Sequence, residues 1–168
     1  FGVSSHQFDQ AERGFSTRFD ADLDMRMSKR NTLSAYEVVN KYSYDDLRKV
    51  LFDYGDIRNA NAMAKVLIAS REVEEIRTTD ALKQALKQFL PEHKQHKILA
   101  QIYQAIRIEV NQEIEVIKEF LEQVPDLLNP KGRLSVISYH SLEDRLVKRF
   151  IRAGQFEGEP EKDFYGNI

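Results

Sequence analysis

Apolar positions recur at helical spacing between residues 31 and 90, in short runs that capping residues separate. Ser34 can cap a short helix through Tyr42, and Ser43 with Asp46 forms the pattern of a capping box. The second run makes one apolar stripe before Gly55: Leu47, Val50, Leu51 and Tyr54. The pattern predicts two short helices joined by a tight turn.

Two further helices are predicted before Pro91. The Ala-rich stretch from Ile57 to Ile76 is typical of a longer helix, and Thr78 or Thr79 can cap the next one. The apolar face of that last helix is Leu82, Leu86, Phe89 and Leu90. Short helices with tight turns between them predict a small helical subdomain.

After a polar connection, the apolar spacing from Leu99 to Val124 predicts one long helix. Turn residues at 129–132 lead into a predicted strand at 133–139, and Ser141 with Asp144 predicts the cap of a final helix. The expected inward face of that helix is Leu142, Leu146, Phe150 and Ile151. Helix, strand and helix make one unit of an α/β sheet protein, so the rest of the sheet must come from elsewhere.

The composition is that of a soluble globular protein, with 42% hydrophobic and 31% charged residues among 168. Because Cys is absent, a disulfide scaffold, a thiolate metal site and a cysteine nucleophile are excluded. The longest apolar runs are too short to span a membrane, and we expect a cytoplasmic protein. The chain starts without Met, which we interpret as a start inside a longer protein.

The net charge of −2 says nothing about partners, but basic residues are concentrated from Lys131 to Arg152. The basic residues there are Lys131, Arg133, Arg145, Lys148, Arg149 and Arg152. Two interpretations stay open, namely a surface that meets phosphate groups and an ordinary solvated helix face.

No metal site is predicted. The run from Asp20 to Asp24 resembles the opening of a calcium loop, but Met25 and Asn31 occupy the positions that require Gly and Glu. The four His residues show no metal-ligand spacing, and no Gly-rich nucleotide loop is present.

Polar residues of catalytic type follow the predicted strand, at Tyr139, His140, Ser141 and Glu143. A hydrolytic triad is one interpretation, and a capping box with a solvent-facing His140 is the other. The position is notable because the carboxyl ends of strands are where α/β sheets bind ligands.

Six strings, in this order, resemble the consecutive motifs of the MraW/RsmH family. They are GVSSHQFD (2–9), AERGFS (11–16), LDMRM (23–27), DYGD (53–56), YQAIRIEVN (103–111) and GRLSVISYHSLEDR (132–145). The resemblance covers almost the whole chain. Before Tyr103 the chain departs from many members, so RNA contacts made there are not carried over.

The resemblance implies methylation of the exocyclic N4 of a cytidine in the decoding region of 16S ribosomal RNA, with S-adenosylmethionine (SAM) as methyl donor. It implies an α/β fold, the C-terminal part of a Rossmann-like class I methyltransferase core with an all-α insertion domain. We expect a strand end and cofactor-side loop at 1–10, a helical substrate-recognition domain at 11–98 and the later core at 99–168. We also expect the small ribosomal subunit and 16S rRNA as partners, no membrane association and a possible homodimer.

The resemblance also implies positions for the site. Gln7, with Gly2 and Ser4, falls on the cofactor side, and we expect the chain by itself to bind no SAM because the family's Gly-rich half is missing. Candidates near the target base are Asp24, Arg26, Tyr139, His140, Ser141 and Glu143. Candidates for RNA binding are Arg145, Lys148, Arg149 and Arg152.

Two classes of function follow from these features. In the first, the parent protein is a SAM-dependent rRNA methyltransferase and this chain is an inactive part of it. In the second, the chain is a non-catalytic RNA- or ribosome-docking module of methyltransferase ancestry, acting mainly through its helical segment.

Overall fold

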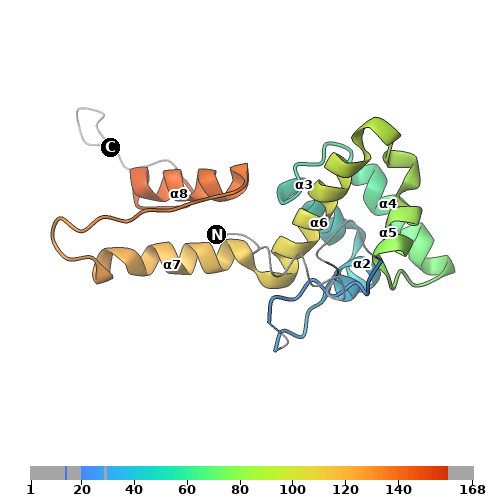
Figure 1. Ribbon diagram of the computed structural model, residues 1–168, viewed down its shortest axis with the longest axis horizontal. Helices are drawn as coiled ribbons and strands as arrows, with labels where there is room; N and C mark the ends of the chain where they lie inside the picture. The colour runs from blue at the N-terminus through green and yellow to red at the C-terminus, as the bar shows by residue number, and fades with distance from the viewer. Residues whose placement is uncertain (1–13, 15–19, 29, 159–168) are drawn as a thin grey trace. The chain divides into compact units, whose positions relative to one another are not determined.

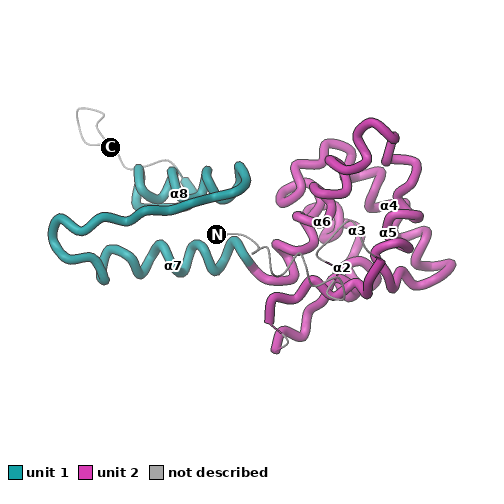
Figure 2. The backbone as a smooth tube through the Cα atoms, in the orientation of Figure 1, with its two compact units in different colours: residues 1–2, 113–168 teal, residues 3–112 magenta. Residues whose placement is uncertain are grey.

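The computed structural model describes residues 14, 20–28 and 30–158, which are helical apart from connecting segments and one isolated β-bridge (Figure 1). The described residues up to Gln112 form one compact unit, which we call the helical unit, and those from Glu113 onward form the C-terminal unit (Figure 2). None of the described helices is long and apolar enough to cross a bilayer.

Three helices of the helical unit begin at the predicted capping residues, whereas two others begin at Ala60 and Gln95 rather than at Ile57 and Leu99. Its elements are α2 (Ala35–Lys41), α3 (Tyr44–Asp53), α4 (Ala60–Val73), α5 (Thr79–Ala85), η2 (Lys87–Phe89), η3 (Glu92–Lys94) and α6 (Gln95–Asn111). Ser34, Ser43 and Thr78 stand at the N-caps of α2, α3 and α5. The hydroxyls of Ser43 and Thr78 each accept a backbone hydrogen bond at 3.2 Å from the first turn. The Ala-rich helix α4 is shorter at both ends than the predicted range.

A single apolar core fills this unit. It gathers the predicted stripe of α3 with residues of α4, α5 and α6. Members with no more than 1% exposure include Leu47, Leu51, Met63, Leu67, Leu82, Ile102 and Ile106. The segment before α2 joins the core through an antiparallel bridge between Asp22 and Thr78, where the Leu23 N–H donates to the Arg77 carbonyl at 3.0 Å.

The prediction of one helix from Leu99 to Val124 is wrong. The chain forms α6 and then α7 (Glu113–Leu127), with Gln112 between them in the left-handed region at φ 50° and ψ 41°. The Gln112 N–H bonds back to the Glu109 and Ile108 carbonyls, which closes the last turn of α6. Apolar residues continue at helical spacing through this point, so periodicity could not reveal the break.

In the C-terminal unit, α7 packs against α8 (Ser141–Ala153) around Ile117, Leu121 and Val147. The predicted strand at 133–139 is not confirmed, because residues 133–138 have no ladder partner among the described residues. Burial nevertheless alternates along the segment. Leu134 and Val136 pack against the cluster, whereas Ile137 is 70% exposed.

The start of α8 differs from the predicted capping box. The N-cap is His140, Ser141 is already helical, and neither side chain makes a capping bond to the first turn. The inward face also shifts, because Val147 is buried while Ile151 is 66% exposed. The predicted α/β sheet is therefore not confirmed in the described residues, which are mostly helical.

Candidate functional site

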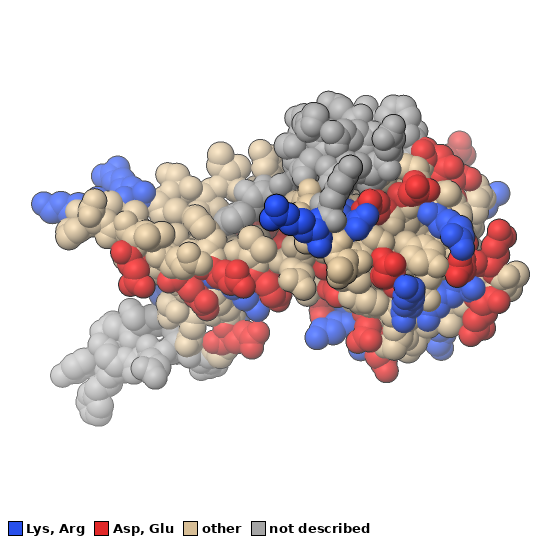
Figure 3. Space-filling view, turned by 90° about the horizontal axis from the view of Figure 1, so that it is seen from below, with Lys and Arg blue, Asp and Glu red and all other residues tan. Residues whose placement is uncertain are grey.

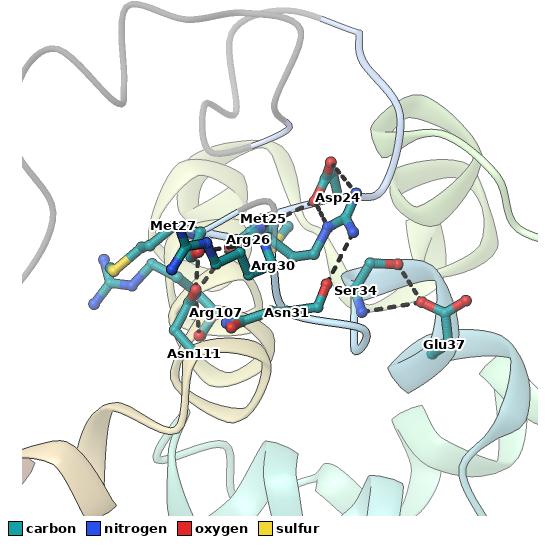
Figure 4. Close-up of polar contacts among 11 residues, drawn as sticks. Asp24, Met25, Arg26, Met27, Arg30, Asn31, Ser34, Glu37, Arg107 and Asn111 are labelled. Carbon is teal, nitrogen blue, oxygen red and sulfur yellow. Dashed lines mark hydrogen bonds and ion pairs between the residues drawn. The ribbon is translucent and has the colours of Figure 1, made fainter.

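The LDMRM loop, residues 23–27, lies between α2 and α6 of the helical unit (Figure 4). Leu23 and Met25 are buried, and Met25 has a left-handed backbone at φ 56°. The loop carbonyls accept hydrogen bonds from the start of α2, from Ala35 to Asp24 at 2.8 Å and from Tyr36 to Leu23 at 2.7 Å. The loop is thus fixed to α2 through its backbone.

Asn111, the last residue of α6, fixes the loop from the other side. Its Oδ1 accepts from the Met27 N–H at 2.6 Å, and its Nδ2 donates to the Met25 carbonyl at 2.8 Å. Nδ2 also bonds to the Arg107 carbonyl one turn earlier at 2.9 Å. Sequence reasoning assigned no role to Asn111, because its contacts with the loop form only when the chain folds.

Asp24 and Arg26, both predicted near the target base, are paired with each other. Arg26 Nε lies 2.6 Å from Asp24 Oδ1, and Arg26 Nη2 donates to Asp24 Oδ2 at 3.0 Å. The third contact is with the Asn31 carbonyl at 2.9 Å. The hydrogen bond and charge of Asp24 raise the pKa of Arg26, so the guanidinium stays protonated. These contacts hold the loop in place and leave both side chains about 30% exposed.

The other base-side candidates lie in the C-terminal unit. Glu143 is fully buried, accepts a hydrogen bond from the Tyr139 N–H at 3.0 Å, and has its other oxygen 3.1 Å from His140 Nε2. His140 has a side-chain exposure of 12%, so the interpretation of His140 as a solvent-facing histidine was wrong. Tyr139 is 78% exposed, and Ser141 is also exposed at the first turn of α8.

The structure adds Glu113 to this group. Glu113, His140 and Glu143 each offer one ligand-type atom, and these three atoms lie within 4.8 Å of one another. Glu113 begins α7 and is 9% exposed. Its distance along the chain from His140 explains why no spacing pattern could include it.

A further cavity of about 370 Å³ lies in the helical unit. It is lined by Tyr42, Asp46, Lys49, Val50, Tyr54 and Glu109. The Tyr42 hydroxyl donates to Glu109 at 2.5 Å, and burial together with that carboxylate raises the pKa of Tyr42. Both side chains are therefore partly withdrawn from solvent, and this cavity was also missed from sequence.

The predicted RNA-binding residues are all exposed on α8. Lys148 pairs with Asp144 at 2.8 Å, and Arg149 donates to the Gly158 carbonyl. On the face shown in Figure 3, basic and acidic side chains are interspersed over the helical unit rather than gathered in one field. The cofactor-side residues Gly2, Ser4 and Gln7 lie outside the described residues.

Comparison with known proteins places the chain clearly. Residues 1–162 match the family model described as the MraW methylase family. A protein of Flavobacterium johnsoniae named ribosomal RNA small subunit methyltransferase H is 67% identical over 167 residues. Proteins of the same name from Christiangramia forsetii and Bacteroides thetaiotaomicron are 63% and 46% identical.

The matches cover 99–100% of this chain and 55–56% of those three relatives. The chain therefore spans little more than half the length of the curated relatives that it matches.

Proposed function

The chain belongs to the MraW methylase family, and from this premise we propose that the protein carrying it methylates the exocyclic N4 of a cytidine in the decoding region of 16S rRNA. The observation that carries the proposal is the 67% identity to a ribosomal RNA small subunit methyltransferase H, maintained over 99% of this chain. Identity at that level over nearly the whole chain supports the same chemistry.

The methyl donor would be SAM, whose sulfonium makes the methyl group electrophilic. The amino nitrogen of cytosine is a weak nucleophile because its lone pair is delocalised into the ring. The protein's contribution is therefore mainly to position the base and to place a hydrogen-bond acceptor beside the amine. A base within folded RNA must also be turned out of its stack to react.

The C-terminal unit supplies a fixed backbone with an exposed aromatic ring. Glu143 holds the Tyr139 N–H, while the Tyr139 side chain stays 78% exposed. An exposed aromatic ring is the group on which an unstacked RNA base packs. We assign Tyr139 to stacking and Glu143 to positioning, since the carboxylate is buried and bonded to the backbone.

The alternating segment 133–138 supports the Rossmann-like core as part of this proposal. Its outer side, where Ile137 is 70% exposed, has the pattern of a strand that pairs within a sheet and is covered on both faces. The part of the relatives that the chain does not span would supply the neighbouring strands. In this view the helical unit is the substrate-recognition domain.

The decisive experiment is methyl transfer from labelled SAM to small ribosomal subunits by the intact protein, with nucleoside mass spectrometry of the product. We expect one N4-methylated cytidine in the decoding region. Stoichiometric binding to the subunit without transfer would instead identify a docking module, and methylation of another atom or base would contradict the proposed specificity.

A further inference from the structure

The grouping of Glu113, His140 and Glu143 joins the start of α7 to the start of α8 within the C-terminal unit. Glu143 is fully buried, and Glu113 is 9% exposed. Two carboxylates brought together away from water repel each other and lose hydration, and a cation between them relieves both costs. The cluster therefore has the electrostatic character of a cation site.

The geometry of the Glu143 carboxylate also favours a cation site. Its Oε2 accepts the Tyr139 N–H, which fixes the orientation of the whole carboxylate. Its Oε1 is buried and accepts no hydrogen bond from a described residue, although it lies 3.1 Å from His140 Nε2. Ligand atoms that share one tetrahedral zinc ion at about 2.0–2.2 Å lie about 3.3–3.6 Å apart, with their lone pairs directed at the metal rather than at each other.

We propose that Glu113, His140 and Glu143 bind one divalent transition-metal ion, of which Zn²⁺ is the best match. One imidazole and two carboxylates form the mixed nitrogen and oxygen donor set that zinc accepts, and three protein ligands leave a coordination position for water. Alkaline-earth ions are less suited, because they prefer oxygen ligands alone. The ion ties the first residue of α7 to the residue that caps α8. It also fixes the backbone at Tyr139.

Calorimetric titration of the intact, chelator-treated protein with Zn²⁺ alone, and separately with Mn²⁺, tests this site. We expect one Zn²⁺ per chain, bound more tightly than Mn²⁺ as the general affinity order requires. The variants E143Q and H140N should each weaken zinc binding by at least about tenfold. E115Q, an exposed neighbour on α7, and the double variant H93A/H96A, which removes two exposed histidines, should bind zinc as the parent does.

Circular dichroism establishes that each variant is folded. If E143Q fails that check, E113Q replaces it, because Glu113 is less buried than Glu143. Absence of saturable zinc binding by the parent protein would overturn the proposal. Zinc binding lost in H93A/H96A but retained in H140N and E113Q would show an adventitious ion only, and would overturn it equally.

Discussion

Asn111 and Met27 lie far apart in the sequence, yet the side-chain amide of Asn111 accepts a hydrogen bond from the Met27 N–H at 2.6 Å. The same amide donates to the Met25 carbonyl at 2.8 Å. A single side chain thus satisfies two backbone groups of the LDMRM loop, which has no regular secondary structure to satisfy them.

Replacing Asn111 with Ala should therefore destabilise the protein strongly. The substitution removes three hydrogen bonds and leaves partly buried backbone groups unsatisfied, which should lower the free energy of unfolding by about 2–4 kcal/mol. Urea unfolding measures the change. The matched control is N61A on the exposed side of α4, expected within about 0.5 kcal/mol of the parent. Equal effects of the two substitutions would contradict the role of Asn111 in holding the LDMRM loop.

From the Asp24–Arg26 pair we predict that Lys at position 26 cannot make all the contacts that Arg26 makes. Arg26 contacts both carboxylate oxygens and the Asn31 carbonyl, a fork that a single ammonium cannot reproduce. Because both side chains are about 30% exposed, solvent weakens the pair, and R26K should cost only about 1 kcal/mol in unfolding free energy. A double-mutant cycle with D24N should show coupling. Normal stability with lost methyl transfer in R26K would instead place Arg26 on the substrate.

Substitutions at Gly14 and Gly154 can separate the cost of backbone strain from the cost of steric overlap by an added Cβ. Both have left-handed backbones, at φ 68° and 67°, so Ala at either position costs about 1–2 kcal/mol from conformation alone. At Gly14 a Cβ would also lie 2.5 Å from the Asp22 carbonyl oxygen, whereas nothing lies within 4 Å at Gly154. G14A should therefore reduce unfolding free energy more than G154A. The reverse order would mean that residue 14 does not pack on Asp22.

From the contacts of the Asp20 carboxylate we predict a loss of folding stability in acid. The backbone N–H of Asp80 donates to its carboxylate at 2.9 Å and lowers the pKa of Asp20 below its ordinary 3.8, with smaller help from Thr78 and Thr79. A carboxyl whose pKa is lower in the folded state stabilises the protein above its unfolded pKa and loses that contribution as pH falls. The advantage of the parent over D20N should be present at neutral pH and be lost progressively as pH falls below 3.8 and through the lower pKa of the folded state. A pH-independent difference in urea unfolding would refute this role.

The sequence predicted what is encoded locally. Ser34, Ser43 and Thr78 mark helix starts because a cap acts within one turn, and no distant residue is needed to recognise it. The end of α6 at Gln112 was missed, since the apolar stripe continues into α7 and only a backbone torsion changes.

The inward face of α8 was misassigned in part. Phe150 packs in the cluster as predicted, but Val147 is buried there and Ile151 is exposed. The face shifts because α7, which is distant in sequence, contributes Ile117 and Leu121 to the cluster.

For the candidate site, too, the sequence predicted local features and missed the contacts that form only on folding. The LDMRM residues were found through family resemblance, but their partners Asn111 and Asn31 were not, because those contacts depend on tertiary packing. Glu113 was missed for the same reason, since only folding brings α7 to the start of α8.

The basic face of α8 gives the last prediction, for RNA binding by the intact protein. All four basic residues are exposed, but Lys148 pairs with Asp144 and Arg149 donates to the Gly158 carbonyl, so Arg145 and Arg152 are the pair to test. Reversing the charge at Arg145 and Arg152 should raise the KM for ribosomal RNA and reduce the steepness of its salt dependence by about one to two counterions. The variant R145Q/R152Q, with half the charge change at the same positions, should shift KM and the salt dependence in the same direction by a smaller amount. Unchanged KM and salt dependence in R145E/R152E would assign α8 to an ordinary solvated face.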